Sequence, residues 1–214
     1  PADNASLIQS LLSLPELPPS IETLITDKAE GNPFFIEELI GVLIDRGVFS
    51  RHNGGWQVRP EVDLALVDVP VTLDGLIMSR VDSMGPNARH ILQCASVIGR
   101  EFSPRLLRAL LPDDLLELEA HLTAMEERGF IAYRPGPPQP SYEFRHGLMR
   151  DSVYNSLLFR RRKQLHGDVA HAVERMYPER AAEEPELLAY HLSLSDAPGL
   201  AQPHLVSAGH RARQ

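Results

Sequence analysis

The spacing of apolar residues predicts a chain built mainly from helices. Between Pro33 and Arg46 apolar side chains recur every three or four residues, which is the period of a helix with one buried face. Pro33 suits the first turn of this helix, where no backbone donor is needed, and Gly47 suits its end. The same period recurs in further stripes: Leu7, Leu11 and Leu12; Leu73, Leu76, Ile77 and Val81; Ile91, Ala95 and Ile98; Met149, Val153 and Leu157; and Leu165, Val169, Ala172, Val173 and Met176.

Two places in the chain are rich in β-forming residues instead. Asn53-Gly54-Gly55 lies between two short runs of this kind, and its turn chemistry predicts a small hairpin. Later, the runs Phe130–Tyr133 and Tyr142–Phe144 are separated by a connector with four prolines, which cannot continue a strand ladder. The sequence therefore predicts a second hairpin with an extended loop.

The order of these elements predicts three regions. We expect a helical domain with a small hairpin over 1–84, with its boundary in the segment Met84 to Asn87. A second domain is expected over 85–178, because three helices followed by a hairpin are typical of a winged helix. Its second and third helices are predicted at Ser103–Leu111 and Asp113–Arg128. The small-residue rhythm after position 179 is typical of the start of tetratricopeptide-like helical repeats over 179–214.

Composition and charge make nucleic acid a poor partner for this chain. Hydrophobic residues make up 43% and charged residues 23%, which is enough to bury a core. The net charge of -8 repels phosphate backbones and anionic lipid. The third predicted helix of a winged helix is the one that would enter a DNA groove, and here it carries one cation, Arg128, against six acids, so DNA binding is not expected. We interpret the basic run Arg160–Lys163 as a solvated or partner-facing surface. The acids are Asp113, Asp114, Glu117, Glu119, Glu126 and Glu127.

The location indicated by the sequence is the cytoplasm. No apolar run approaches the roughly 20 residues that span a bilayer, and no signal-peptide order of residues opens the chain. Cys94 is the single cysteine, which favours a reducing compartment and a packing role for the thiol. Because the chain opens on Pro1 rather than Met, we expect it to be part of a longer protein.

The sequence also indicates that this chain is not an enzyme by itself. It contains no GxxxxGK[ST] loop to hold phosphates and no GxSxG elbow to present a nucleophilic serine. His166 and His171 are five residues apart and so do not share a helix face, and His191 is isolated in sequence. We therefore expect neither ATP hydrolysis by the chain alone nor a metal site.

The motif Gly31-Asn32-Pro33-Phe34-Phe35-Ile36-Glu37-Glu38-Leu39 carries the most chemical information. Gly31 frees the backbone, Pro33 fixes the turn, and the aromatic residues begin a buried face. From the residues alone, the spacing favours an ordinary helix start whose first-turn acids complement the helix dipole.

Four blocks together resemble the bacterial STAND ATPases. GNPFFIEEL, VPVTLDGLIMSRVDSM, ILQCASVIGREF and YEFRHGLMRDSVYNSLL follow one another in the order found in that family. The similar proteins are ATPase regions fused to class III adenylate or guanylate cyclases or to LuxR-type transcription regulators. The resemblance implies a regulatory fragment that closes over ADP or ATP bound by an upstream P-loop domain, with helical repeats downstream, and that relays a signal to such an effector.

The resemblance also implies three nucleotide-contacting residues. Pro33 corresponds to a proline that packs against adenine, His146 to a histidine that reaches the diphosphate, and Arg80 to an arginine of the lid that senses phosphate. The residues themselves leave other roles open, since Arg80 also suits a surface salt bridge and His146 also suits a helix cap or a pair with Glu143. For the whole chain, the alternative function is a winged-helix module that binds DNA or another protein.

Overall fold

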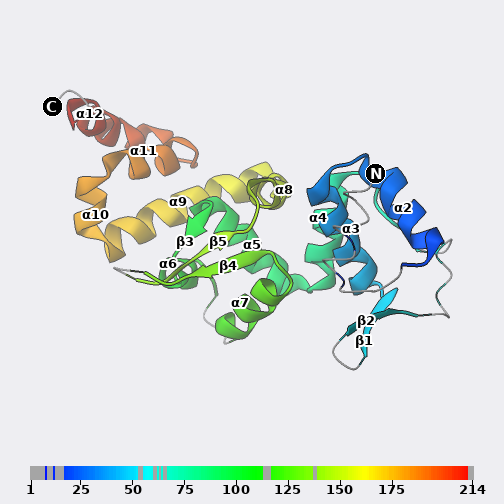
Figure 1. Cartoon of the computed structure of the whole chain (residues 1–214). Coiled ribbons are helices and arrows are strands. Elements are labelled where there is room, and N and C mark those ends of the chain that lie inside the picture. The colour runs from blue at the N-terminus through cyan, green and yellow to red at the C-terminus, as the bar shows by residue number, and fades with distance from the viewer. Residues whose placement is uncertain are drawn as a thin grey trace. The chain divides into compact units, whose positions relative to one another are not determined.

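The computed structural model describes residues 8, 12, 17–52, 55–59, 62, 64, 67–112, 117–136 and 139–211. The fold is mainly helical with two small antiparallel sheets, so the predicted fold class is confirmed at this level. Two units can be distinguished, Pro1–Gly85 and Pro86–Gln214, and the first ends within the segment 84–87. Residues 179–211 belong to the second unit (Figure 1). No helix in the described ranges has the length and apolar character needed to cross a membrane.

The first unit is a helical layer followed by a hairpin and one more helix. The stripe from Phe35 to Leu43 is buried on α3, as its spacing predicts, and α2 and α4 pack against that helix. The described elements are α2 (Pro19–Ala29), α3 (Pro33–Asp45), β1 (Phe49–His52), β2 (Gly55–Val58) and α4 (Leu73–Ser83).

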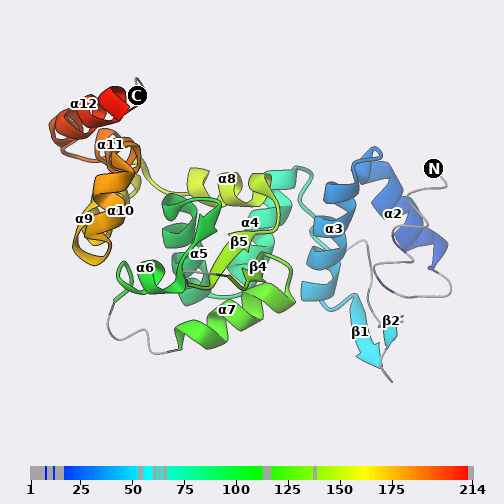
Figure 2. The ribbon, with the colours of Figure 1, turned by 60° about the vertical axis from the view of Figure 1, so that its left-hand side comes forward.

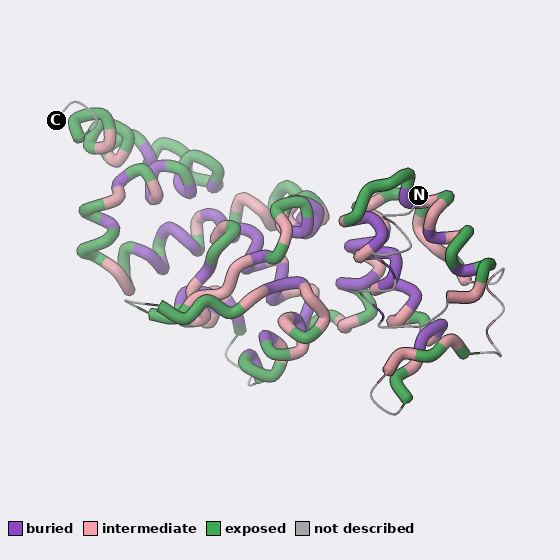
Figure 3. The backbone as a smooth tube through the Cα atoms, viewed as in Figure 1, coloured by how far each residue is buried: buried purple, intermediate pink, exposed green. Residues whose placement is uncertain are grey.

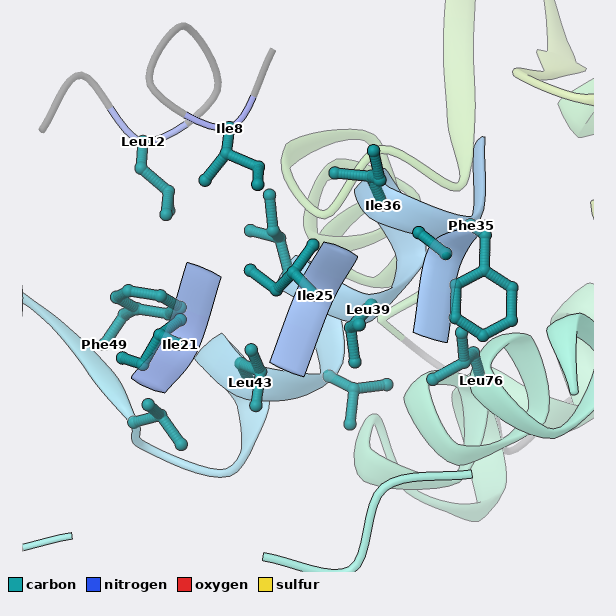
Figure 4. Close-up of a cluster of buried hydrophobic side chains, with 14 residues drawn as sticks. Ile8, Leu12, Ile21, Ile25, Phe35, Ile36, Leu39, Leu43, Phe49 and Leu76 are labelled. Carbon is teal, nitrogen blue, oxygen red and sulfur yellow. The ribbon is translucent and has the colours of Figure 1, made fainter. Parts of the chain in front are cut away.

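The core of this unit gathers apolar side chains from every element around α3. Figure 4 shows Ile21 and Ile25 of α2 with Leu39 and Leu43 of α3, and all four side chains are almost fully buried. Burial of each such side chain contributes about 1.5 to 3 kcal/mol. Leu7 and Leu11 of the first predicted stripe, and Asn53-Gly54 of the hairpin turn, lie outside the described residues; β1 and β2 pair antiparallel on either side of that turn.

The second unit is organised around a three-stranded antiparallel sheet in the order β3-β5-β4. Figure 2 shows α5, α6 and α7 around this sheet. Its described elements are α5 (Pro86–Ile98), β3 (Glu101–Phe102), α6 (Pro104–Arg108), α7 (Leu118–Glu127), β4 (Ile131–Arg134), β5 (Ser141–Phe144), α8 (Gly147–Asn155), α9 (Phe159–Met176), α10 (Pro178–Glu183), α11 (Pro185–Ser193), the 3-10 turn η2 (Pro198–Leu200) and α12 (Ala201–Arg211).

The sequence prediction of this unit needs two corrections. The strand β3 was missed because it has two residues and exists only through its pairing with β5, in which Phe102 lies opposite Tyr142. The helix predicted at Ser103–Leu111 is shorter than expected, Pro104–Arg108. For the helix predicted at Asp113–Arg128, residues 113–116 lie outside the described ranges and α7 begins at Leu118.

The long helix α9 connects the sheet-containing part of the unit to its last helices. Buried and exposed positions alternate along it with the helical period (Figure 3). Its buried stripe of Leu165, Val169 and Val173 packs among α5, α6, α10 and α11. The apolar stripe predicted for residues 165–176 is therefore the core-facing side of this helix.

Candidate functional site

Pro33 lies at an exposed, well-defined helix start. The Asn32 side chain caps α3, its Oδ1 accepting hydrogen bonds from the backbone nitrogens of Phe34 at 3.1 Å and Phe35 at 3.3 Å. Gly31 has a φ of 82°, a left-handed conformation that favours glycine. Phe35 is buried whereas Pro33 is exposed, so the proline ring is held on the surface where a planar group could pack against it.

Arg80 is buried and paired with an acid of the same motif. Its Nη1 donates to Oε2 of Glu38 at 2.8 Å, and the two side chains are only 8% and 3% exposed. The interpretation of Arg80 as a surface salt bridge was therefore wrong about its location. The interpretation of the motif's acids as first-turn dipole partners was also wrong for Glu38, which lies in the second turn of α3 and is turned towards α4.

Gly41 makes room for this ion pair. A Cβ atom at position 41 would lie 2.4 Å from Nε and 2.6 Å from Cζ of Arg80, so a larger residue would displace the guanidinium group. Glu38 and Gly41 are three residues apart and share one helix face. Sequence reasoning missed both residues; the available signal was an acid three residues before a glycine within the apolar stripe of the predicted helix.

His146 occupies the N-cap position of α8. Its carbonyl oxygen accepts hydrogen bonds from the backbone nitrogens of Met149 at 3.1 Å and Arg150 at 3.4 Å, whereas its imidazole makes no capping hydrogen bond. The prediction that His146 opens a helix is confirmed, and the alternative of a side-chain cap is wrong. The carboxylate of Glu143 accepts a hydrogen bond from Arg134. A Cβ at Gly147 would meet no atom within 4 Å, so the start of α8 is open on that side.

The three predicted nucleotide-contacting residues are divided between the two units. Pro33 and Arg80 belong to the first unit, in which Arg80 pairs with a residue five positions after Pro33. His146 belongs to the second. Their assignment to a nucleotide site stays a prediction.

A buried histidine pair was not foreseen from the sequence. His166 and His191 lie 25 residues apart, yet their Nδ1 atoms are 2.9 Å apart, and the Tyr154 hydroxyl lies 2.9 Å from Nε2 of His166. His191 is isolated in the sequence, but in the structure it contacts another histidine, so the description of it as isolated was wrong. Burial is the main cause that lowers the pKa of His166 to about 4 and of His191 to about 3, so both imidazoles are neutral at pH 7.

The thiol of Cys94 is buried. Burial raises the pKa of the Cys94 thiol to about 12, which keeps it protonated and unreactive at pH 7. Within the part of the chain that the structure describes, no group of three or more His, Cys, Asp or Glu residues could hold a metal ion.

The basic run 160–163 is divided among local contacts. The Arg162 guanidinium lies 4.3 Å from the centre of the Tyr154 ring, and Lys163 Nζ lies 5.0 Å from that of Phe159. Arg161 Nη1 donates to Oε1 of Gln164 at 2.9 Å. Three of the four cations in this run thus have local contacts on α8 or α9.

Two comparisons with known proteins match parts of the chain. A family model described as a domain of unknown function (DUF8739) matches residues 2–54. An uncharacterized protein of Rhizobium meliloti (strain 1021) is 31% identical over 137 residues, which cover 64% of this chain and 13% of the relative. The chain thus spans only a small part of the length of that relative.

Proposed function

We propose that this chain is the regulatory part of a nucleotide-switched ATPase of the STAND type. The first unit acts as the lid and residues 85–178 as a winged helix, while 179–214 begin a series of tetratricopeptide-like repeats. Lid and winged helix close over ADP or ATP bound by an upstream P-loop domain, and opening relays a signal to an effector such as a nucleotide cyclase or a transcription regulator.

The topology of the second unit supports the winged-helix part of the proposal. Its elements follow the order helix, strand, helix, helix, strand, strand, from α5 to β5. The strand between the first two helices pairs with the last strand, which places β5 at the centre of the sheet. A winged helix with a first strand and a two-stranded wing would have this connectivity, which supports the proposal.

The geometry at His146 is the observation that carries the nucleotide part of the proposal. At the start of α8 the imidazole does not cap the helix, and the neighbouring Gly147 leaves space in front of the first turn. Backbone N–H groups and the positive end of the helix dipole favour a phosphate at such a position. His146 would donate to the diphosphate, and the exposed ring of Pro33 would pack against adenine.

Arg80 has a different place in this proposal. Its guanidinium is paired with Glu38 and its side chain is only 8% exposed, so in this state it is not presented to a phosphate in solvent. In the state described, Arg80 would hold α4 to α3, and a phosphate-sensing role would require the lid to rearrange. The location proposed for the whole protein is the cytoplasm.

The length of the relative supports a multidomain context. The region similar to this chain makes up 13% of that protein, so the same kind of region is found within a much longer chain. The upstream P-loop domain and the effector are therefore proposed as parts of a longer protein and not as separate partners.

Removing the His146 side chain in the protein that includes the P-loop domain tests this function. We expect His146→Ala to weaken ADP binding roughly tenfold to hundredfold, because a hydrogen bond to a charged group is worth about 1.5 to 3 kcal/mol. Calorimetric titration with ADP measures the affinity, and His121→Ala, in a histidine of α7, is the matched control. An unchanged ADP affinity together with a lower melting temperature would reduce His146 to a structural residue.

The alternative of DNA binding is less well supported. On α7 the residues Leu118, Leu122 and Met125 are buried, while Glu119 and Glu127 are exposed. A helix that presents carboxylates repels the phosphates of a DNA groove.

A further inference from the structure

The joint between α9 and α11 is polar at its centre, although helices ordinarily pack through apolar side chains. His166 of α9 and His191 of α11 face each other across it and are 0% and 1% exposed. Ser195 is buried at the same joint, where a Cβ at Gly167 of α9 would lie 3.7 Å from its own Cβ. In addition, α10 packs on α9 and α12 packs on α11 (Figure 1). The helices α10 to α12 are therefore attached to the rest of the unit mainly through α9.

A tyrosine extends the histidine pair into the body of the unit. The Tyr154 hydroxyl, on α8, lies 2.9 Å from Nε2 of His166. Two guanidinium groups lie against the Tyr154 ring, with that of Arg150 at 4.7 Å and that of Arg162 at 4.3 Å from its centre. Arg150 Nε in turn donates to the carbonyl oxygen of Ser96 on α5 at 2.8 Å. A continuous series of polar contacts thus runs from α5 through α8 and α9 to α11.

The contacts of the histidine pair favour neutral imidazoles. A neutral ring has one donor and one acceptor, and His166 uses both, one towards His191 and one towards Tyr154. A proton on either ring would create a buried cation, and the arginine charges that act on the pair are also positive. A second proton would set two N–H groups against each other across 2.9 Å. The titratable and charged side chains around the pair are Arg150 and Tyr154 of α8, Arg162 of α9 and Tyr190 of α11.

Two ion pairs at the edge of the joint respond differently to acid. Lys163 Nζ lies 3.8 Å from Asp196 Oδ1, and His204 Nε2 lies 3.9 Å from Glu174 Oε1. They link α9 to the segment after α11 and to α12, and both are partly exposed, so they hold the joint only weakly. Protonation of His204 would strengthen its pair with Glu174. Any opening of the joint in mild acid therefore depends on the histidine pair.

We propose that Tyr154, His166 and His191 form a latch that holds α10 to α12 on α9, and that breaking it releases these helices while the rest of the second unit stays folded. Release is easier at a polar joint than at an apolar one, because water replaces the lost hydrogen bonds. The latch does not depend on nucleotide binding. It does give α8, which begins at His146, a route of direct contacts to the last helices.

Hydrogen exchange followed by mass spectrometry tests the latch in the 214-residue chain. Because α11 has nine residues, too few to stay helical once undocked, its amides exchange when the joint opens. Tyr154→Phe keeps the ring but leaves Nε2 of His166 buried without its partner, and opening relieves this cost. We expect the protection factors of α11 to fall about tenfold and those of α5 to change less. Tyr133→Phe, in an exposed tyrosine of β4, is the matched control and should change neither.

Mild acid provides an independent test. The pKa of His166 is about 4 in the closed joint and returns to about 6.5 in water, so the open joint binds more protons as the pH falls. For His166 alone, the protection factors of α11, which are corrected for the direct effect of pH, should fall about twentyfold between pH 7 and pH 5. The double variant His166→Leu/His191→Leu should lose most of this dependence. The exposed His171→Gln on α9 should keep it.

The proposal would be overturned if Tyr154→Phe, with an unchanged circular dichroism spectrum, lowered the protection of α11 no more than Tyr133→Phe. It would equally be overturned if α5 lost as much protection as α11 in either test, because the unit would then unfold as a whole. Retention of the full acid dependence in the double leucine variant would also overturn it.

Discussion

The ion pair between Glu38 and Arg80 makes a sharp prediction about the stability of the first unit. We expect Glu38→Gln to destabilise this unit strongly, because the substitution removes the negative charge from a buried ion pair. The exposures of 3% and 8% mean that water cannot replace the lost partner. Gly41 adds to the effect, since it holds the guanidinium closely against α3.

The magnitude follows from the burial. Removing one partner of a buried pair costs about 3 to 5 kcal/mol, whereas an exposed pair is worth under about 1 kcal/mol. A domain has a total stability of about 5 to 15 kcal/mol, so the loss is a large part of it. For a unit of 60 to 100 residues, about 3 kcal/mol corresponds to a fall in Tm of about 12 °C or more.

Trp56 provides the assay. It is the single tryptophan of the chain and packs against the core of the first unit, so its fluorescence reports the unfolding of that unit separately. Urea titrations of Glu38→Gln, Arg80→Met and the double variant form a mutant cycle, with the exposed Glu22→Gln on α2 as control. A loss under 1 kcal/mol for Glu38→Gln, or a coupling energy near zero in the cycle, would refute the stabilising role of the pair.

Three further outcomes are expected. Gly41→Ala should lower the urea midpoint of the Trp56 transition by an amount equal to about 1 to 3 kcal/mol, because the new methyl group displaces the Arg80 guanidinium; an unchanged midpoint would contradict this packing. The second unit should lose stability as the pH falls from about 6.5 towards 4, because the lowered pKa values of His166 and His191 mean that the unfolded chain binds more protons in this window. For His166 the loss reaches about 3 kcal/mol below pH 4, and thermal melts followed by circular dichroism should show a flatter pH dependence in His166→Asn. Cys94 should react with a thiol reagent at pH 8 only after denaturant is added, because burial raises the pKa of its thiol to about 12; fast labelling of the folded chain would contradict its burial.

Much of the helical structure could be predicted because its causes are local. The stripe along α3, the cap at Asn32 and the proline at the first turn all act within a few residues of one another, so they can be recognised without knowing what the helix packs against. The hairpins could be predicted for the same reason, from turn residues and β-forming runs. The opening of α8 at His146 also follows from the residues around it.

The features that depend on distant residues required the tertiary structure. Strand β3 has two residues and no pattern of its own, so only its pairing with β5 defines it. Arg80 and Glu38 are 42 residues apart, and the surface or buried character of an arginine depends on what covers it.

The sequence by itself thus determined the mainly helical character of this protein, its β-prone segments, and the absence from it of a phosphate-binding loop. Only the tertiary structure decided which polar groups are buried together. It joined His166 of α9 to His191 of α11, and it paired Glu38 of α3 with Arg80 of α4. The physical reason is that helical period and capping are short-range effects, whereas burial, ion pairing and cavity shape arise where segments far apart in the chain meet.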